Sequence, residues 1–342
     1  MAELPTSSSS PRALTPWLAG VEEWLLAKSE FRMVPDLVVP IPSRGPRPRG
    51  GPGRRVGFVG FPSDYSLLIL LGLLHSEVEL VGLATSLGAN PAIAGENALS
   101  QVADHVGVPL LRLARVNEYD SLAVLRRLGA DLFVVASFDQ ILHRRALEIP
   151  PMGWVNIHPS LLPRYRGPEP VYWALANGEQ ESGVSFQRVA AGIDAGPLLY
   201  QATEEVRPRD TAGTLTRRLT ELAWRHVPQV VDEALHGAPG KPMDLSTGSY
   251  FTSVGHRRID NLDSVITADR LVRAGDPNML AAACLEGRVA YVRRAISVAA
   301  DDGRPGPRLH FPDGDLLLLE LAGSCGCHHA EPVGSCPHDE TA

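Results

Sequence analysis

Three side chains that could act together on a carbonyl group stand in two short segments of this 342-residue chain. Asn156 and His158 are two residues apart in the run WVNIHPS, and Asp194 stands between Gly192 and Gly196 in GIDAG. Residues two apart in a strand point to the same face, so the amide and the imidazole would lie side by side. An amide can stabilise a carbonyl oxygen and an imidazole can move a proton. The glycine backbone would let the carboxylate approach a ligand closely.

Each of these residues also has a purely structural interpretation. A histidine at a strand end commonly serves as a hydrogen-bond partner in the core or at the surface. An aspartate in a glycine-rich turn commonly shapes the turn or caps a helix. None of the three alone therefore predicts catalysis.

The elements that must position these residues follow from the hydrophobic pattern. Runs rich in apolar residues begin at residues 54, 78, 108, 130 and 153, with helical patterns between them. The uninterrupted run ADLFVVAS is typical of a strand in a parallel sheet that is covered on both faces. The alternation predicts a doubly wound, mostly parallel α/β domain, in which ligands bind outside the carboxyl ends of the strands. The strand that contains Asn156 has the most polar end, so we expect the site there.

Composition divides the chain into four parts. Residues 1–54 combine a serine run, an amphipathic pattern and an arginine-rich, Gly/Pro-rich segment. They predict a flexible extension and linker, with a docking arm for a partner or RNA as the alternative. We expect the catalytic domain at residues 55–240 and a small β-rich, barrel-like domain at residues 248–323. Residues 324–342 are crowded with Cys and His, and an incidental tail, a zinc site and a redox-active thiol pair stay open.

The overall composition is that of a soluble globular protein. Hydrophobic residues make up 44% of the chain, charged residues 21%, and the formal net charge is −7. No apolar run reaches the roughly 18 residues that a membrane-spanning helix needs, and the N-terminus lacks the apolar region of a secretory signal. The four cysteines do not form the pattern of a disulfide framework. We therefore expect a cytoplasmic protein that does not bind membranes.

The long run NIHPSLLPRYRG, followed by Gly183-Val184 and GIDAG, resembles the signature of formyltransferases that use 10-formyltetrahydrofolate. This family includes methionyl-tRNA formyltransferases, amino-sugar formyltransferases and formylation domains of peptide synthetases. The resemblance is clear over residues 55–235, and a weaker similarity to the family's OB-like C-terminal domain follows. It implies a Rossmann-like catalytic domain and a catalytic set at Asn156, His158 and Asp194. It also implies three folate-contacting segments, formed by Gln140, Ile141 and Leu142, by Ser160, Leu161, Leu162 and Pro163, and by Ala190, Ala191, Gly192 and Ile193.

The mechanism implied by the resemblance needs no metal. A substrate amine attacks the formyl carbon, and the amide of Asn156 and the ring of His158 stabilise the oxyanion that develops. Asp194 holds the imidazole and favours its protonated form by opposite charge. His158 or Asp194 takes the proton of the attacking ammonium group, directly or through water.

The charge pattern favours a small-molecule or carrier-tethered amine as the acceptor. Residues 56–111 contain no Lys or Arg against five acids, and residues 250–323 contain nine Arg and no Lys against ten acids. Binding of several phosphates needs an excess of positive charge, so tRNA is disfavoured. The alternative is a methionyl-tRNA formyltransferase. A formyltetrahydrofolate hydrolase and a non-catalytic folate-binding protein are further alternatives.

Overall fold

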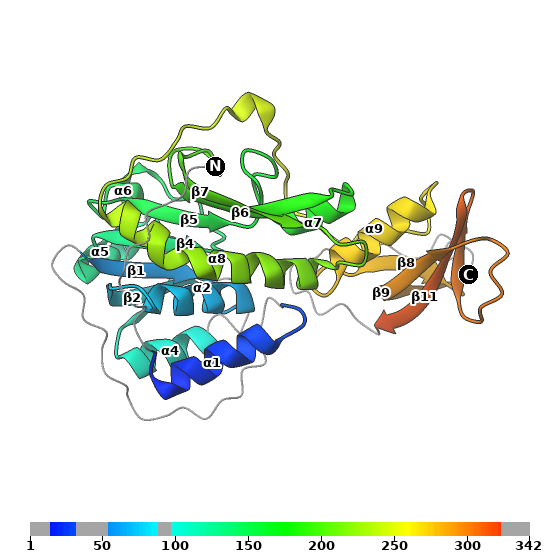
Figure 1. Ribbon diagram of the computed structural model, residues 1–342, viewed down its shortest axis with the longest axis horizontal. Helices are drawn as coiled ribbons and strands as arrows, with labels where there is room; N and C mark the ends of the chain where they lie inside the picture. The colour runs from blue at the N-terminus through cyan, green and yellow to red at the C-terminus, as the bar shows by residue number, and fades with distance from the viewer. Residues whose placement is uncertain (1–13, 32–53, 88–96, 323–342) are drawn as a thin grey trace.

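The protein consists of a larger unit built on a seven-stranded sheet and a smaller unit built on a four-stranded sheet (Figure 1). The structure is a computed structural model and describes residues 14–31, 54–87 and 97–322. The strands of the larger sheet are β1 (Arg55–Gly60), β2 (Glu79–Ser86), β3 (Leu110–Leu113), β4 (Leu132–Ala136), β5 (Trp154–His158), β6 (Glu181–Arg188) and β7 (Leu198–Glu205). Its helices are α1 (Pro16–Ala27), α2 (Asp64–Leu74), α4 (Ala98–Val106), α5 (Tyr119–Leu128), α6 (Arg144–Leu147), α7 (Pro170–Ala176) and α8 (Ala212–Leu235).

The larger sheet has the order β3-β2-β1-β4-β5-β6-β7. The first five strands in this order pair in parallel, whereas β6 pairs antiparallel with both β5 and β7. The prediction of a doubly wound, mostly parallel sheet is therefore confirmed. The carboxyl ends of β1, β4 and β5 lie at one edge, where such sheets place their ligands.

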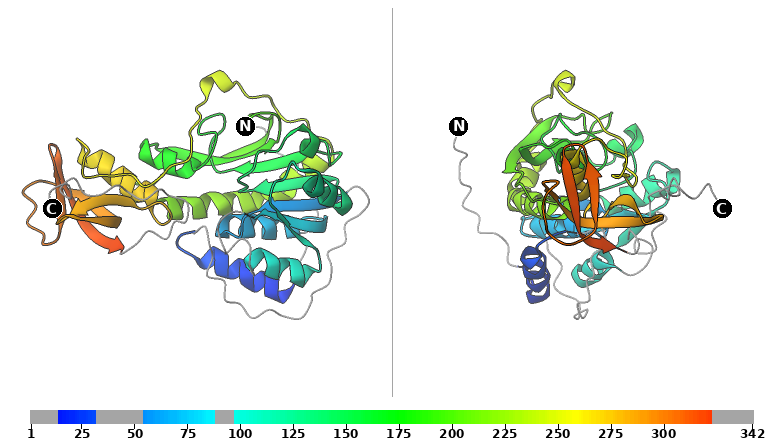
Figure 2. Two further views of the ribbon diagram at one scale, coloured as in Figure 1. Left: turned by 180° about the vertical axis from the view of Figure 1, so that it is seen from behind. Right: turned by 90° about the vertical axis from the view of Figure 1, so that its right-hand side faces the viewer.

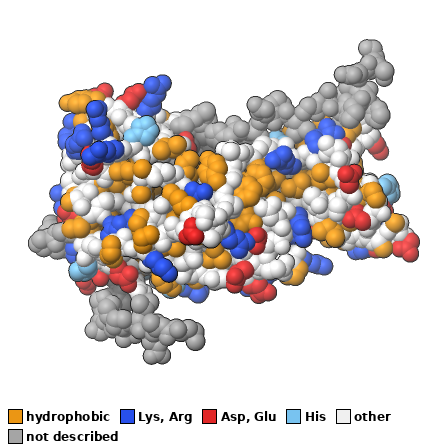
Figure 3. Space-filling view, turned by 90° about the horizontal axis from the view of Figure 1, so that it is seen from above, with side chains coloured by type: hydrophobic (Ala, Val, Ile, Leu, Met, Phe, Trp, Pro, Cys, Tyr) orange, Lys and Arg blue, Asp and Glu red, His pale blue; other side chains and the backbone are white. Residues whose placement is uncertain are grey.

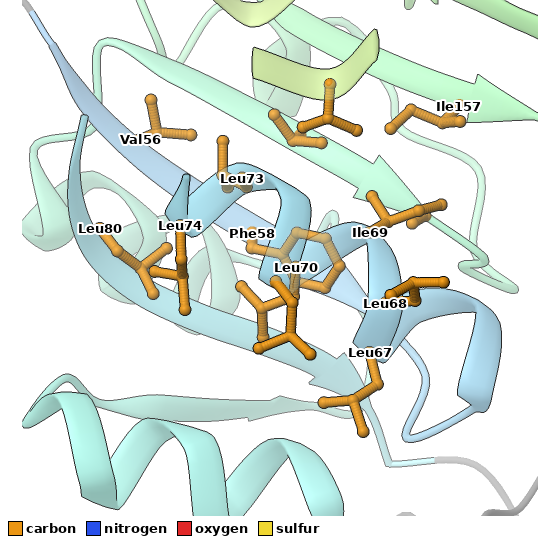
Figure 4. Packing of buried hydrophobic residues seen from close by; sticks show 14 of the residues in the cluster. Val56, Phe58, Leu67, Leu68, Ile69, Leu70, Leu73, Leu74, Leu80 and Ile157 are labelled. Carbon is orange, nitrogen blue, oxygen red and sulfur yellow. The ribbon is translucent and has the colours of Figure 1, made fainter. Parts of the chain in front are cut away.

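Helix α2 is the most buried helix of the larger unit. All of its residues are buried, as expected for a helix that is apolar on every side, and its leucines pack against β1, β2 and β5 (Figure 4). Gly72 lets α2 approach α8 closely, because a Cβ there would lie 2.9 Å from the ring of Trp224. On the opposite face of the sheet, α5 packs over Phe133 and Trp154, whose rings stack at 4.4 Å. Both faces are thus covered, which fixes the position of the strand ends.

Helix α1 packs against the larger unit, although residues 1–54 were expected to be a flexible extension. Leu18, Val21 and Leu25 are buried at helical spacing, and Phe31 is buried after the helix. All four belong to the same hydrophobic cluster as α2 and α8. Residues 14–31 are therefore part of the core, because their apolar face covers the outer side of α2. Residues 1–13 and 32–53 lie outside the described residues.

The smaller unit is antiparallel and sits at one end of α8 (Figure 2). It contains α9 (Val265–Gly275), β8 (Ala281–Leu285), β9 (Arg288–Val298), β10 (Arg308–Phe311) and β11 (Gly314–Ala322), with the strand order β10-β11-β9-β8. Helix α9 shares a hydrophobic cluster with this sheet. The prediction of a small β-rich unit is confirmed. The Cys/His-rich tail at residues 324–342 lies outside the described residues.

Candidate active site

The structure brings Asn156, His158 and Asp194 together at the carboxyl end of β5. The Nδ2 atom of Asn156 donates to Oδ1 of Asp194 at 3.2 Å. The same oxygen lies 3.7 Å from Nδ1 of His158. The side chains of His158 and Asp194 are 8% and 12% exposed, so the pair is largely shielded from water. The two chain segments that the sequence singled out therefore converge on one place.

Neutral donors hold the carboxylate of Asp194. Besides Asn156, Nε2 of Gln187 donates to Oδ1 at 2.9 Å, and the backbone N–H of Gly167 donates to Oδ2 at 2.9 Å. Within the described ranges, His158 is the only group within ion-pair distance of this carboxylate. Hydrogen bonds to the charged form favour it, so this environment stabilises a carboxylate without neutralising it.

The imidazole of His158 has one nitrogen fixed by the backbone. Its Nε2 atom lies 2.8 Å from the carbonyl oxygen of Tyr165, which only accepts hydrogen bonds, so we assign the hydrogen to Nε2. In the neutral ring, Nδ1 then carries a lone pair and faces Asp194. The 3.7 Å separation is too long for a hydrogen bond. A proton taken up at Nδ1 would therefore create a cation beside a shielded carboxylate.

The loop after β5 is fastened from two sides. Ser185 on β6 donates from Oγ to the carbonyl of Ser160 at 2.6 Å and accepts from the N–H of Leu162 at 3.0 Å. From the other side, Oγ of Ser249 accepts from the N–H of Tyr165 at 2.8 Å. Ser249 belongs to the segment between α8 and α9, so the connection between the two units also braces the catalytic loop. Pro163 lies on this loop, and its carbonyl accepts from Ser249 N–H at 3.2 Å.

The turn that carries Asp194 has an unusual backbone. Asp194 itself adopts a φ of 47°, in the left-handed region that non-glycine residues occupy rarely and that often occurs at functional sites. Gly196 must be a glycine, because a Cβ there would lie 1.7 Å from the carbonyl oxygen of Arg188. The turn therefore packs tightly against the end of β6 and directs the carboxylate toward β5.

The expected folate-contacting residues lie on the loops that surround this set. Ile141, in the loop after β4, is 58% exposed, and Ile193, in the turn before Asp194, is 37% exposed. Ala190 and Ala191 precede Ile193 in the same turn, and Gly192 has a φ of 99°. Exposed branched apolar side chains thus lie on both loops, and their contact with a folate stays a prediction.

Other members of the expected folate set have structural partners. Gln140 accepts from the N–H of Val116 at 2.7 Å, and its Nε2 atom donates to the carbonyls of Leu113 and Ala114. Its side chain therefore braces a neighbouring loop, and only its backbone remains for a ligand. Leu142 is partly buried against the α5 side of the sheet. Leu161 is half-buried, and Leu162 is buried.

Sequence reasoning missed three contributors to this site. Gln187 lies directly opposite Asn156 on β6, and the alternating polar residues of the run SFQ, at Ser185 and Gln187, could have indicated it. The backbone N–H of Gly167 carries no sequence signal. Tyr65, the second residue of α2, donates to the carbonyl of Ile157 at 2.8 Å. Burial and the charge of Asp194 raise the pKa of Tyr65, so its hydroxyl remains a donor.

Two negative observations apply to the described part of the chain. Residues 14–31, 54–87 and 97–322 contain no group of three or more His, Cys, Asp or Glu side chains placed to hold a metal ion. None of the helices in these ranges has the length and apolar character needed to cross a membrane.

Known proteins resemble this chain over most of its length. Residues 88–231 match the family model described as formyl transferase. The chain is 33% identical over 289 residues to the methionyl-tRNA formyltransferase of Roseiflexus castenholzii, covering 80% of this chain and 92% of the relative. It is 35% identical to that of Acidothermus cellulolyticus, covering 78% and 83%. A solved N-formyltransferase from Helicobacter canadensis, in complex with folinic acid and dTDP-3-aminofucose, has a TM-score of 0.55 at 15% identity and covers 79% of this chain and 99% of that chain. The last similarity concerns the fold alone.

Proposed function

The chain belongs to the formyltransferase family, and on this premise we propose that it moves a formyl group from 10-formyltetrahydrofolate to the amino group of methionyl-tRNA. Folate-dependent formyl transfer follows from the family. The acceptor is the part that we propose. The relatives named above support it, because the similarity to them spans 80% and 78% of the chain and so extends beyond the catalytic domain.

The observation that carries the chemical proposal is the convergence of Asn156, His158 and Asp194. The bound folate supplies the formyl group that the amine attacks. Nδ2 of Asn156 has a second hydrogen besides the one donated to Asp194, and it can stabilise negative charge on the formyl oxygen. Nδ1 of His158 can take the proton of the attacking amine, and the imidazolium can return it to the folate nitrogen as the bond between that nitrogen and the formyl carbon breaks. Asp194 then stabilises the imidazolium without forming a tight ion pair beforehand.

A small-molecule or carrier-tethered amine is the second candidate acceptor, and the distribution of charge favours it. Six of the nine arginines in residues 250–323 pair with carboxylates, namely Arg258, Arg273, Arg293, Arg294, Arg304 and Arg308. Over the face shown in Figure 3, Lys and Arg side chains are scattered in small groups with acidic side chains among them. A phosphate backbone would find few free cations on these surfaces.

One assay separates the candidate functions. Purified protein is incubated with 10-formyltetrahydrofolate and methionyl initiator tRNA, a panel of small amines, or no amine, and tetrahydrofolate release and formylated product are measured. We expect formyl-methionyl-tRNA, with an affinity that falls as salt rises. Formylation of small amines with tRNA left unmodified would instead assign the second candidate. Release without any amine would indicate a hydrolase, and binding without release would indicate a folate-binding protein.

We further propose that the reaction takes place in the cytoplasm. This proposal rests on the four cysteines of the chain, which do not form the pattern of a disulfide framework. Fractionation of cells that produce the tagged protein tests it.

A further inference from the structure

The segment that follows α1 reaches the first turn of α2, at the edge of the sheet where the site lies. Nζ of Lys28 lies 2.8 and 2.7 Å from the two carboxylate oxygens of Asp64. The side chain of Asp64 is fully buried and that of Lys28 is 20% exposed. The ammonium group also lies 4.1 Å from the ring centroid of Trp24. A charge pair at this depth is costly to break, because the remaining carboxylate would lose its cation.

The first turn of α2 is in turn bound to the catalytic edge. Tyr65 follows Asp64, and its hydroxyl donates to the carbonyl of Ile157, the residue between Asn156 and His158. One residue further, Oγ of Ser66 donates to the carbonyl of Ala136 at the end of β4 at 2.6 Å. Contacts therefore run without interruption from Lys28 to the peptide that joins the two catalytic residues of β5.

The N-terminal segment is itself fixed in place. Nη2 of Arg217 donates to the carbonyl of Leu26 at 2.6 Å, and the N–H of Phe31 donates to the carbonyl of Gly213 at 3.0 Å. Both partners lie on α8. Lys28 therefore projects from a backbone that is hydrogen-bonded to α8 on either side of it.

We propose that Lys28 and Tyr65 are positioning residues for formyl transfer. Residues 14–31 hold the first turn of α2 in position, and Tyr65 in turn positions the β5 backbone between Asn156 and His158. The inference rests on the proposed role of these two residues in the reaction. The field of Asp194 at the Tyr65 hydroxyl agrees with it, since the two groups are near enough to interact. The competing interpretation is that the ion pair contributes to stability alone.

The chain offers a matched control, because it contains two lysines and the other one, Lys241, is exposed. We expect Lys28→Met to lower kcat roughly tenfold relative to Lys241→Met, with a small change in the KM for 10-formyltetrahydrofolate, because small displacements of catalytic groups reduce rates steeply. Lys28→Arg, which keeps the cation, should retain most of the activity. Equal kcat values for Lys28→Met and Lys241→Met would overturn the proposal.

A second pair of variants distinguishes positioning from stability. In Lys28→Met/Asp64→Asn the buried carboxylate that Lys28 contacts is gone as well, so the unfolding midpoint should recover while kcat stays low. Tyr65→Phe should lower kcat severalfold by itself, and its combination with Lys28→Met should cost less than the product of the single effects, because the two act in series. Recovery of kcat together with stability, or fully multiplicative effects, would contradict positioning.

A structural readout keeps this test independent of the acceptor. Amide hydrogen exchange at residues 154–158 should quicken in Lys28→Met and in Tyr65→Phe, but not in Lys241→Met. If wild-type protein transfers formyl groups to no amine, the proposed function fails while the exchange result still stands. If transfer is observed and exchange in these residues is unchanged, the positioning proposal alone fails.

Discussion

The carboxylate at the catalytic edge and the carboxylates of the smaller unit are bound by different kinds of hydrogen-bond donor. Asp194 accepts hydrogen bonds from two side-chain amides and one backbone N–H, all of them neutral. In the smaller unit, Asp260 is bound by the guanidinium of Arg258, and Asp315 is paired with Arg308. A carboxylate already paired with arginine contributes to folding. One held by neutral donors keeps its charge for another partner, here the imidazole of His158.

The largest loss of activity is expected when the negative charge of Asp194 is removed. Asp194→Asn should lower kcat on the order of 10³-fold or more, because the protonated imidazole loses the only carboxylate within ion-pair distance of it among the described residues. The fold should persist, since the single amide oxygen can still accept from Gln187 and Asn156, which share one oxygen of Asp194, and only the bond from the N–H of Gly167 to the other oxygen is lost. Steady-state formyl transfer and circular dichroism of the same preparation measure both quantities.

Asp260→Asn is the matching control for this comparison. It removes the same charge from an arginine-paired site, and kcat should stay within about twofold of wild type. Comparable losses of activity in the two variants would mean that the two kinds of carboxylate do not differ in function.

A smaller loss of activity is expected when the hydrogen-bond donor Asn156 is removed. Asn156→Ala removes an amide that faces the reacting carbonyl in our proposal, which typically costs about 10²–10³ in kcat. The KM for 10-formyltetrahydrofolate should change little, because the hydrogen bond strengthens only as charge develops. A raised KM with unchanged kcat would assign Asn156 to ground-state binding instead.

The sheet could be predicted from the sequence because its strands are continuous apolar runs with a strong local signal. The proximity of Asn156, His158 and Asp194 could be expected only through the family resemblance, since strand periodicity places the first two but not the third. The contributions of Gly167 and Tyr65 could not be foreseen. One is a backbone N–H and the other depends on how α2 packs against β5, so neither follows from local pattern.

The packing of the N-terminal segment likewise could not be predicted from the local sequence pattern. Leu18, Val21 and Leu25 have helical spacing, but spacing does not reveal which surface a helix covers. The composition of the neighbouring Gly/Pro-rich residues suggested a linker for the whole of 1–54. The burial of residues 14–31 depends on tertiary contacts with α2 and α8, which only the three-dimensional arrangement supplies.

Removal of an arginine-paired carboxylate should change the stability of the protein rather than its rate of formyl transfer. Burial alone would raise the pKa of Asp260, but hydrogen bonds from Arg258 and from the N–H of Cys284 outweigh it and hold that pKa below its ordinary value. The stabilisation is therefore present at neutral pH and is lost as the pH falls below the ordinary aspartate pKa. Asp260→Asn should lower the free energy of unfolding by about 2–3 kcal/mol at pH 7, and this difference should shrink in acid. Urea unfolding at several pH values measures it, and a difference that is constant with pH would contradict the charge-based account.

The smallest effect is expected at Asp276, a buried carboxylate between α8 and the smaller sheet whose pKa is raised although Arg293 lies 3.3 Å from it. Burial and the charge of Glu30 raise its pKa to about 6, and the opposing charges of Arg293 and Arg294 do not outweigh them; Glu320 adds to the increase. Because the folded state binds this proton more tightly, its stabilisation is present below the ordinary aspartate pKa and is lost as the pH rises toward 6.

Asp276→Asn should therefore gain about 1–2 kcal/mol in unfolding free energy relative to wild type between pH 4 and pH 7; the raised pKa from which this follows already includes the opposing charge of Arg293, 3.3 Å away. Its backbone carbonyl, which accepts from Gly213 N–H at 3.0 Å, is unaffected by the substitution. Parallel pH profiles for the two proteins would show that Arg293 neutralises Asp276 after all. Asp276 would then belong with the arginine-paired carboxylates, and Asp194 would be the exception among the four compared.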